Sequence, residues 1–377
     1  MRNLKLIISF LFISVSMIRP VAITPQEEVR IANKHIKIAL LLDTSNSMDG
    51  LIDQAKAQLW DIVNELSLAK CKNGHPDLTI ALYEYGNDQL SASEGYIRQV
   101  LGFSSDLDEI SEKLFSLTTN GGEEYCGQVI QTSLNQLDWG DDQADLKMIF
   151  IAGNEPFTQG TVPYKEAIVE AVTKGVVVNT IFCGNYERGI RAFWKDGAGI
   201  GKGEYMAIDQ NKKSIHITSP YDADILKYNK KLNATYIPFG TLGHSKIRNQ
   251  SVQDANAMQY SSANAVQRTI SKSSHLYSNS SWDLVDAIDA KNFNYDQLNK
   301  AELPSELQGK SNEDIKAYVT LKKKERTIIQ KEIQALNAKR MVYVTAQKKL
   351  NNTSDGLGNA MIEAIQKQAV KKGFWWE

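Results

Sequence analysis

The stretch IALLLDTSNSMDG, residues 38–50, joins a run of apolar residues to one acid and a group of hydroxyl side chains. An uninterrupted apolar run is typical of a strand that is covered on both faces, as in a parallel sheet. Apolar residues at helical spacing follow over residues 48–69. The acid and the hydroxyls therefore fall on a turn between a buried strand and a helix, where parallel sheets bind their ligands.

The same alternation continues along the chain and predicts the fold class. Amphipathic helices are predicted between most of the strands, over short connections. This order indicates an α/β fold at residues 36–240, with a doubly wound, mostly parallel sheet and helices on both faces. The further strands are predicted at residues 78–86, 95–103, 146–153, 176–184 and 203–209.

A C-terminal helical region follows the sheet domain. Residues 250–349 are predicted to form an antiparallel helical hairpin whose second helix keeps part of a heptad, interrupted by Arg340 and Gln347. A partner-binding coiled coil is the alternative for this region. A last amphipathic helix, residues 357–377, contains FWW at residues 374–376, which could dock on the body of the protein or on a partner.

The N-terminus has the pattern of a secretory leader. Arg2 and Lys5 precede an apolar run over residues 6–18, which is too short to cross a bilayer comfortably. We expect residues 1–22 to be a signal peptide, and the mature chain to be periplasmic or secreted without membrane insertion. An uncleaved anchor is the alternative.

Composition excludes several classes of protein. The formal net charge is −1, so no global field favours nucleic acid. The three cysteines include no CxxC pair, which argues against a zinc site or a disulfide framework. There is no HExxH, GxSxG or GxxxxGK[ST] motif, so the sequence does not predict an enzyme.

The acid and hydroxyls after the first strand suit a hard metal ion. Asp43, Ser45 and Ser47 would converge on one point if the chain turns tightly there. A carboxylate and two hydroxyl oxygens suit Mg²⁺, Mn²⁺ or Ca²⁺ and are poor ligands for Zn²⁺. The alternative is that Asp43 or Ser47 simply caps the helix that begins near Met48.

This DxSxS motif resembles the metal-ion-dependent adhesion site of the von Willebrand factor A (VWA) family. The resemblance covers about residues 36–237 and includes the glycine-rich WKDGAGIGKGEYMAI at residues 194–208. It implies a Rossmann-like sheet and a divalent cation held by the DxSxS residues, by a Thr on a second loop and by an Asp on a third. It also implies an open position for an acidic group of a partner.

The second loop departs from the family pattern. It reads LTTNGGEEYCGQ, residues 117–128, and places Glu123 after the glycine pair where the family has Thr. Glu123 is therefore the candidate ligand, with Thr118 and Thr119 as alternatives. If Glu123 does not reach the ion, metal affinity should fall and a site without metal becomes an alternative.

The third loop departs as well. It reads FIAGNEPF, residues 150–157, with Gly153 where the family has Asp. Asn154 and Glu155 stand nearby, and Asn154 is the candidate ligand from this loop. Relative to the family pattern, the site loses the Asp at position 153 and gains Glu123. The number of carboxylates at the ion therefore stays the same if Glu123 binds it.

We therefore predict an exported, bacterial-type VWA binding module. A cation at an atypical adhesion site would recognise a carboxylate on a protein partner. One alternative is a scaffolding role in the cell envelope through the C-terminal helices, with a degenerate metal site. The other is a metal-dependent hydrolase with Glu123 or Glu155 as the base. The residues do not predict the partner, the pathway or the oligomeric state.

Overall fold

The computed structural model describes residues 34–212, 217–351 and 357–376. The predicted leader, residues 1–22, lies outside these ranges. Within them, no helix combines the length and the hydropathy that crossing a membrane requires.

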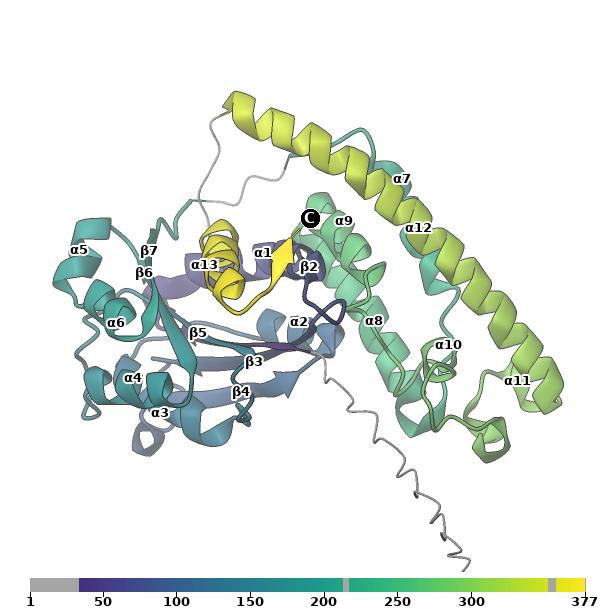
Figure 1. Ribbon diagram of the computed structural model, residues 1–377, viewed down its shortest axis with the longest axis horizontal. Helices are drawn as coiled ribbons and strands as arrows, with labels where there is room; N and C mark the ends of the chain where they lie inside the picture. The colour runs from purple at the N-terminus through teal and green to yellow at the C-terminus, as the bar shows by residue number, and fades with distance from the viewer. Residues whose placement is uncertain (1–33, 213–216, 352–356, 377) are drawn as a thin grey trace, which may run out of the picture. The chain divides into compact units, whose positions relative to one another are not determined.

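A six-stranded sheet forms the centre of the fold, in the order β4-β3-β1-β5-β6-β7 (Figure 1). Neighbouring strands are parallel except β3 and β4, which are antiparallel. The predicted fold class is thereby confirmed, and β1 lies between two parallel neighbours, as its uninterrupted apolar run requires. The strands are β1 (His35–Asp43), β3 (Asp77–Tyr85), β4 (Ile97–Ser104), β5 (Leu146–Gly153), β6 (Val176–Cys183) and β7 (Lys202–Ile208).

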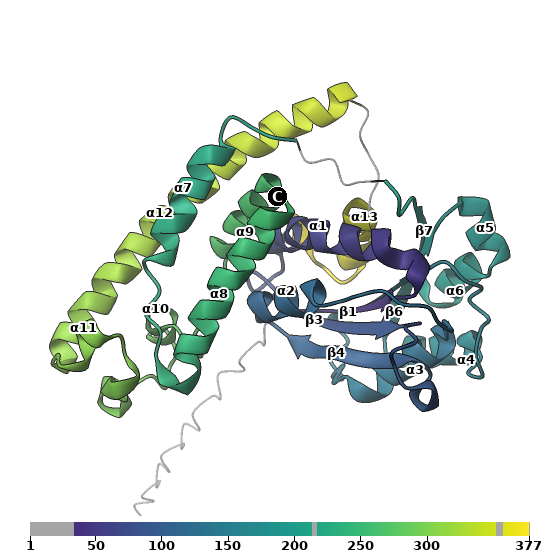
Figure 2. The same ribbon diagram turned by 180° about the vertical axis from the view of Figure 1, so that it is seen from behind.

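Helices cover both faces of the sheet, and alternate side chains of β1 point into two different cores (Figures 1 and 2). Leu40 and Leu42 pack under α1, α2 and α13, whereas Ala39 and Leu41 pack under α3, α4 and α6. The covering helices are α1 (Asp49–Ser67), α2 (Leu107–Phe115), α3 (Cys126–Gln136), α4 (Tyr164–Thr173), α5 (Tyr186–Arg191), α6 (Trp194–Ile200) and α13 (Leu357–Lys371).

The C-terminal helix belongs to the sheet domain. It packs against α1, and the strand after it, β8 (Trp375–Trp376), pairs antiparallel with β2 (Ala69–Lys70). Phe374 is buried, and Trp376 Nε1 donates a hydrogen bond to the Glu65 carbonyl oxygen at 3.0 Å. The aromatic residues at 374–376 were predicted to dock either on the body of the protein or on a partner. In the structure they dock on the body of the protein.

The helical region differs from the predicted hairpin. Helices α8 and α9 form an antiparallel hairpin about Ser261, while the long α12 packs chiefly along α7 and also touches α9 and α10 (Figure 2). The region contains α7 (Asp222–Asn233), α8 (Gly240–Tyr260), α9 (Ser262–Lys272), α10 (Leu284–Ala287), α11 (Ser305–Gln308) and α12 (Asn312–Asn351). Short 3₁₀ turns lie at η1 (Asn46–Met48), η2 (Ala92–Glu94), η3 (Tyr295–Gln297) and η4 (Lys300–Glu302).

One face of α12 is a buried heptad stripe that includes arginines. Val319, Arg326, Ile333 and Arg340 follow one another at seven-residue steps, and all four are buried. Arg340, which the sequence pattern marks as an interruption, donates through Nε to Asp222 Oδ1 of α7 at 3.0 Å. The heptad pattern is therefore used for packing within the chain, with ion pairs at two of its positions.

Candidate metal centre

The end of β1 brings the DxSxS side chains together. Asp43 is fully buried at the carboxyl edge of the sheet, and its Oδ1 accepts a hydrogen bond from the Ser45 backbone N–H at 2.8 Å. The chain turns there, and the Ser45 and Ser47 hydroxyl oxygens lie 3.4 Å apart. Neither η1 nor α1 receives a side-chain cap, so the capping alternative is wrong.

Two polar atoms at this edge lack partners. Asp43 Oδ2 is buried and has no hydrogen-bond partner, and the same holds for Asn154 Oδ1. The other amide atom, Asn154 Nδ2, donates to Ser47 Oγ at 3.0 Å, so the third loop does reach the site. Buried polar atoms are normally paired, and these orphans mark a place where a ligand would be stabilised.

The acid beside Asp43 is Glu124 and not Glu123. Glu124 is 4% exposed and interacts with the carboxylate of Asp43 and the hydroxyl of Ser45. Glu123, the candidate from the sequence, is exposed. The second loop thus supplies an acid as predicted, but from the next position along the chain.

Glycine contacts explain this shift. Gly122 has φ +134°, and a Cβ on it would lie 2.0 Å from the Gly86 carbonyl oxygen. The loop can press against the end of β3 only without that side chain. A Cβ on Gly86, at φ +81°, would meet Glu124 Cγ at 2.8 Å and Asp43 Oδ1 at 3.0 Å. Both glycines therefore make room for the two carboxylates to meet.

The threonines of the second loop form hydrogen bonds with groups other than Asp43. Thr119 is half-buried and its hydroxyl donates to the Asp49 carboxylate in the first turn of α1. The Thr118 carbonyl oxygen accepts a hydrogen bond from Asn87 Nδ2 at 3.0 Å. Thr119 consequently lies at the rim of the site.

Position 153 has no room for a side chain because Tyr85 lies beside it. A Cβ on Gly153 would lie 2.5 Å from the Tyr85 hydroxyl oxygen and 3.0 Å from Asp43 Oδ2. Tyr85 is fully buried and its hydroxyl donates to the Ala152 carbonyl oxygen at 2.9 Å. The space that an Asp side chain would need at position 153 is already filled, which accounts for the departure from the family pattern.

Burial and mutual repulsion perturb both acids. Burial raises the pKa of Asp43 to about 6, although hydrogen bonds from Glu124 and Ser45 lower this pKa. Burial first, and then the charge of Asp43, raise the pKa of Glu124 to about 9. At neutral pH Glu124 therefore keeps its proton unless a cation is added, because two buried carboxylates in contact cannot both ionise cheaply.

The donor atoms fit a hard divalent cation. They are carboxylate, hydroxyl and amide oxygens, from Asp43, Glu124, Ser45, Ser47 and Asn154. Across residues 34–212, 217–351 and 357–376, no group of three or more His, Cys, Asp or Glu could hold a metal ion. A cation here would depend on the hydroxyls and on two carboxylates.

No protein-family model and no curated protein matches the sequence. Among solved structures, the chain is similar to a conserved hypothetical protein, BatB, from Bacteroides thetaiotaomicron, with 17% identity and a TM-score of 0.36 over 46% of this chain and 90% of that one. It is also similar to an aerotolerance-related membrane protein from Bacteroides fragilis, with 15% identity and a TM-score of 0.33 over 46% and 92% of the two chains. The VWA domain of SpRpn10 gives 14% identity and a TM-score of 0.33, over 46% and 87%.

Proposed function

We propose that this protein is a VWA-type, non-catalytic binding module that recognises a carboxylate on a protein partner through a divalent cation. Mg²⁺, Mn²⁺ or Ca²⁺ would be held by Asp43, Ser45, Ser47 and Glu124, with Asn154 at the edge of the site. The cation would supply positive charge and an open position for an oxygen ligand of the partner.

The observation that carries this proposal is the buried contact between Asp43 and Glu124. Two acids that are almost fully buried face one another, and one oxygen of Asp43 has no partner. Buried carboxylates are costly unless a cation or hydrogen-bond donors compensate them. Positioning two of them side by side with hydroxyls is typical of a site for a cation from solution.

Each residue would have a distinct part in holding the ion. Asp43 supplies the charge that is present at neutral pH, and Glu124 supplies a second charge when it releases its proton. The hydroxyls of Ser45 and Ser47 supply neutral oxygens. Asn154 orients Ser47 through its hydrogen bond.

The helices are less well placed to carry recognition. The buried heptad face of α12 packs on the chain's own α7, so it is not free to form a coiled coil with a partner. This favours the cation site over a scaffolding role for the helical region.

Titration calorimetry of the metal-free chain with Mg²⁺, Mn²⁺ and Ca²⁺ tests the proposal. Glu124→Gln should lower the affinity for the metal at least about tenfold, because it removes a charged ligand. Glu123→Gln is the matched control, one residue away and exposed, and should leave the affinity unchanged. Equal effects of the two substitutions, or no saturable heat with the unaltered chain, would contradict the proposal.

We also propose that the chain is exported, on the leader pattern of residues 1–22. N-terminal sequencing of the protein from cell fractions is the test. A mature chain that begins after Ala22 is expected, whereas a chain that keeps residue 1 in the cytoplasmic fraction would contradict export.

A further inference from the structure

The loops around the proposed cation site carry an unusual excess of acids. Four acidic segments meet there, at residues 43–49, 86–96, 116–125 and 153–163, and a fifth, residues 209–212, contacts Ser47 through Gln210 and adds one acid and one base, Asp209 and Lys212. The four acidic segments contain seven Asp or Glu and no Lys or Arg, although the whole chain has 43 basic and 44 acidic residues. The seven are Asp43, Asp49, Asp88, Glu94, Glu123, Glu124 and Glu155.

Contacts place three of these acids at the rim of the buried pair. Asp49 accepts the hydrogen bond from Thr119, and an Asp88 carboxylate oxygen lies 2.3 Å from where a Cβ on Gly121 would be. The charge of Glu155 acts on both Asp43 and Glu124. Asp49 and Asp88 are exposed and Glu155 is half-buried, so their charges face the solvent from which a partner approaches.

The cations near the base of these loops are already engaged. Arg98, which follows the second segment in β4, pairs with the buried carboxylate of Glu84. Lys56 of α1 donates through Nζ to the Leu117 carbonyl oxygen at 3.2 Å. Arg98 is therefore paired with Glu84, whereas the charge of Lys56 acts on Asp53 and Asp49 and compensates Asp49 in part.

The rim and the buried pair have different consequences for a ligand. One divalent cation would balance the two charges of Asp43 and Glu124 and would leave a net negative charge on the other five acids, of which Asp49 interacts with Lys56. A partner with only acidic groups would then be repelled at distances within a Debye length, which is about 8 Å at physiological salt. A partner with cationic side chains beside its carboxylate would be attracted.

We infer that the partner presents a carboxylate flanked by Lys or Arg, and that the acidic rim of Asp49, Asp88, Glu123 and Glu155 selects it. This inference rests on the proposed function, because the carboxylate needs the cation. The independent sign of a ligand is the fully buried Asp43, whose Oδ2 has no partner at the floor of the same site. The rim supplies selectivity, and the cation supplies the contact.

Three five-residue peptides, with blocked termini, test the inference. Their sequences are GKDKG, GSDSG and GEDEG, and their binding to the Mg²⁺-loaded full chain is measured by NMR titration. At about 50 mM salt GKDKG should bind at least about tenfold more tightly than GEDEG, with GSDSG between them. The difference should largely disappear at about 500 mM salt, where the rim is screened.

A rim variant and a matched control separate selectivity from general charge. The double variant Asp88→Asn, Glu123→Gln should keep the Mg²⁺ affinity and reduce the preference for GKDKG several-fold. The control Asp141→Asn, Asp142→Asn removes two exposed acids before β5, at the opposite edge of the sheet, and should leave the preference unchanged.

The outcomes distinguish the two proposals. If Mg²⁺ binds but GKDKG shows no preference over GEDEG, or does not bind at about 10 mM, the inference about the rim is wrong and the cation site stands. If Mg²⁺ itself does not bind, the proposed function fails, and the inference fails with it.

Discussion

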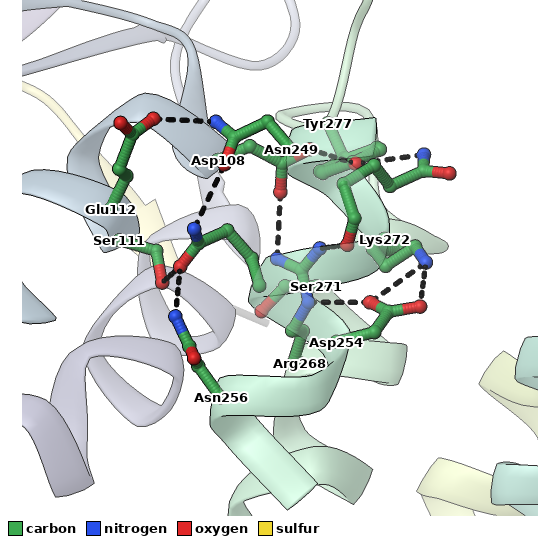
Figure 3. Close-up of polar contacts among 12 residues, drawn as sticks. Asp108, Ser111, Glu112, Asn249, Asp254, Asn256, Arg268, Ser271, Lys272 and Tyr277 are labelled. Atoms are coloured by element: carbon green, nitrogen blue, oxygen red, sulfur yellow. Dashed lines mark hydrogen bonds and ion pairs between the residues drawn. The ribbon is translucent and has the colours of Figure 1, made fainter. Parts of the chain in front are cut away.

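Two groups of buried charges in this molecule are built on opposite rules. Where the helical region meets the sheet domain, acids and bases alternate: Arg268 lies 2.7 Å from Asp108 and 2.6 Å from Asp254 (Figure 3). Lys272 then pairs with Asp254 at 2.9 Å. At the carboxyl edge of the sheet, Asp43 meets Glu124, another acid.

The group of alternating acids and bases connects helix α2 of the sheet domain to helices α8 and α9 of the helical region. Asp108 belongs to α2 of the sheet domain, Asp254 to α8, and Arg268 and Lys272 to α9. Lys272 Nζ also donates to Asn229 of α7 at 3.0 Å. Figure 3 shows Arg268 between the two carboxylates, and every charge in the group has a partner of opposite sign.

The contrast shows how to distinguish a structural site from a binding site. Elsewhere in this chain, arginine and lysine side chains pair with buried acids. The contact between two acids at the sheet edge therefore does not reflect a shortage of basic residues. A buried group that is fully paired within the chain has no need of a ligand, whereas a buried like-charge pair is stabilised by an external cation. Three substitutions can break or sharpen this comparison.

The largest effect is expected from Arg268→Met. It removes the guanidinium, leaves Asp108 buried without a cation and leaves Asp254 with Lys272 alone, which should lower the free energy of unfolding by about 3–5 kcal/mol. Urea denaturation at neutral pH measures this loss. Lys165→Met is the control, because Lys165 is 61% exposed in its pair with Asp196, and should change the stability by less than about 0.5 kcal/mol. A small loss for Arg268→Met would contradict the structural role of the group.

An intermediate effect is expected from Gly153→Asp, which restores the acid of the family pattern. The new side chain would collide with the Tyr85 hydroxyl and crowd Asp43, so we expect a loss of roughly 2–3 kcal/mol and no gain in metal affinity. Tyr85→Phe in the same chain should recover part of the loss. Gly199→Asp is the control, because nothing lies within 4 Å of a Cβ there. A stable Gly153→Asp protein with tighter metal binding would show that Tyr85 does not exclude the acid.

These residues also show how far the sequence can predict the site. The strand at residues 35–43 and the convergence of Asp43, Ser45 and Ser47 follow from an apolar run that ends in a turn, and both are local features. The choice between Glu123 and Glu124 depends on how closely Gly122 approaches Gly86, which are far apart in the sequence. Propensity and periodicity contain no information on that contact.

The same reason applies to Gly153 and to the helical region. The sequence shows that an acid is missing at position 153, but only the structure shows that Tyr85, from another strand, fills its place. In α12 the heptad pattern marks Arg340 as an interruption, whereas its partner Asp222 lies on α7. Local pattern predicted the strands of the main sheet, but it missed the break between α8 and α9 and the short strand at Trp375–Trp376. The pairing of side chains between distant elements determined the roles of the residues.

An effect of opposite sign is expected from Glu124→Gln in the presence of a chelator. The pKa of Glu124 is raised from 4.5 to about 9 in the folded chain. Between these pH values the folded chain keeps a proton that the unfolded chain has released, so the free energy of unfolding of the unaltered protein falls as pH rises. Glutamine does not ionise and can still donate a hydrogen bond to Asp43, so the variant escapes this loss.

The stability of the variant relative to the unaltered chain should therefore rise from about pH 5 to about pH 8, with the variant the more stable of the two at about pH 8. Urea denaturation in a chelator at the two pH values measures it. Glu123→Gln should show no such pH-dependent gain, because its side chain is exposed. Arg268→Met should destabilise the fold because it removes a cation from between two acids. Glu124→Gln should stabilise it because it removes one of two adjacent acids. A loss of stability for Glu124→Gln at about pH 8 would mean that the acid at the sheet edge is compensated within the chain, as Asp254 is, and that the edge is not a site for a cation.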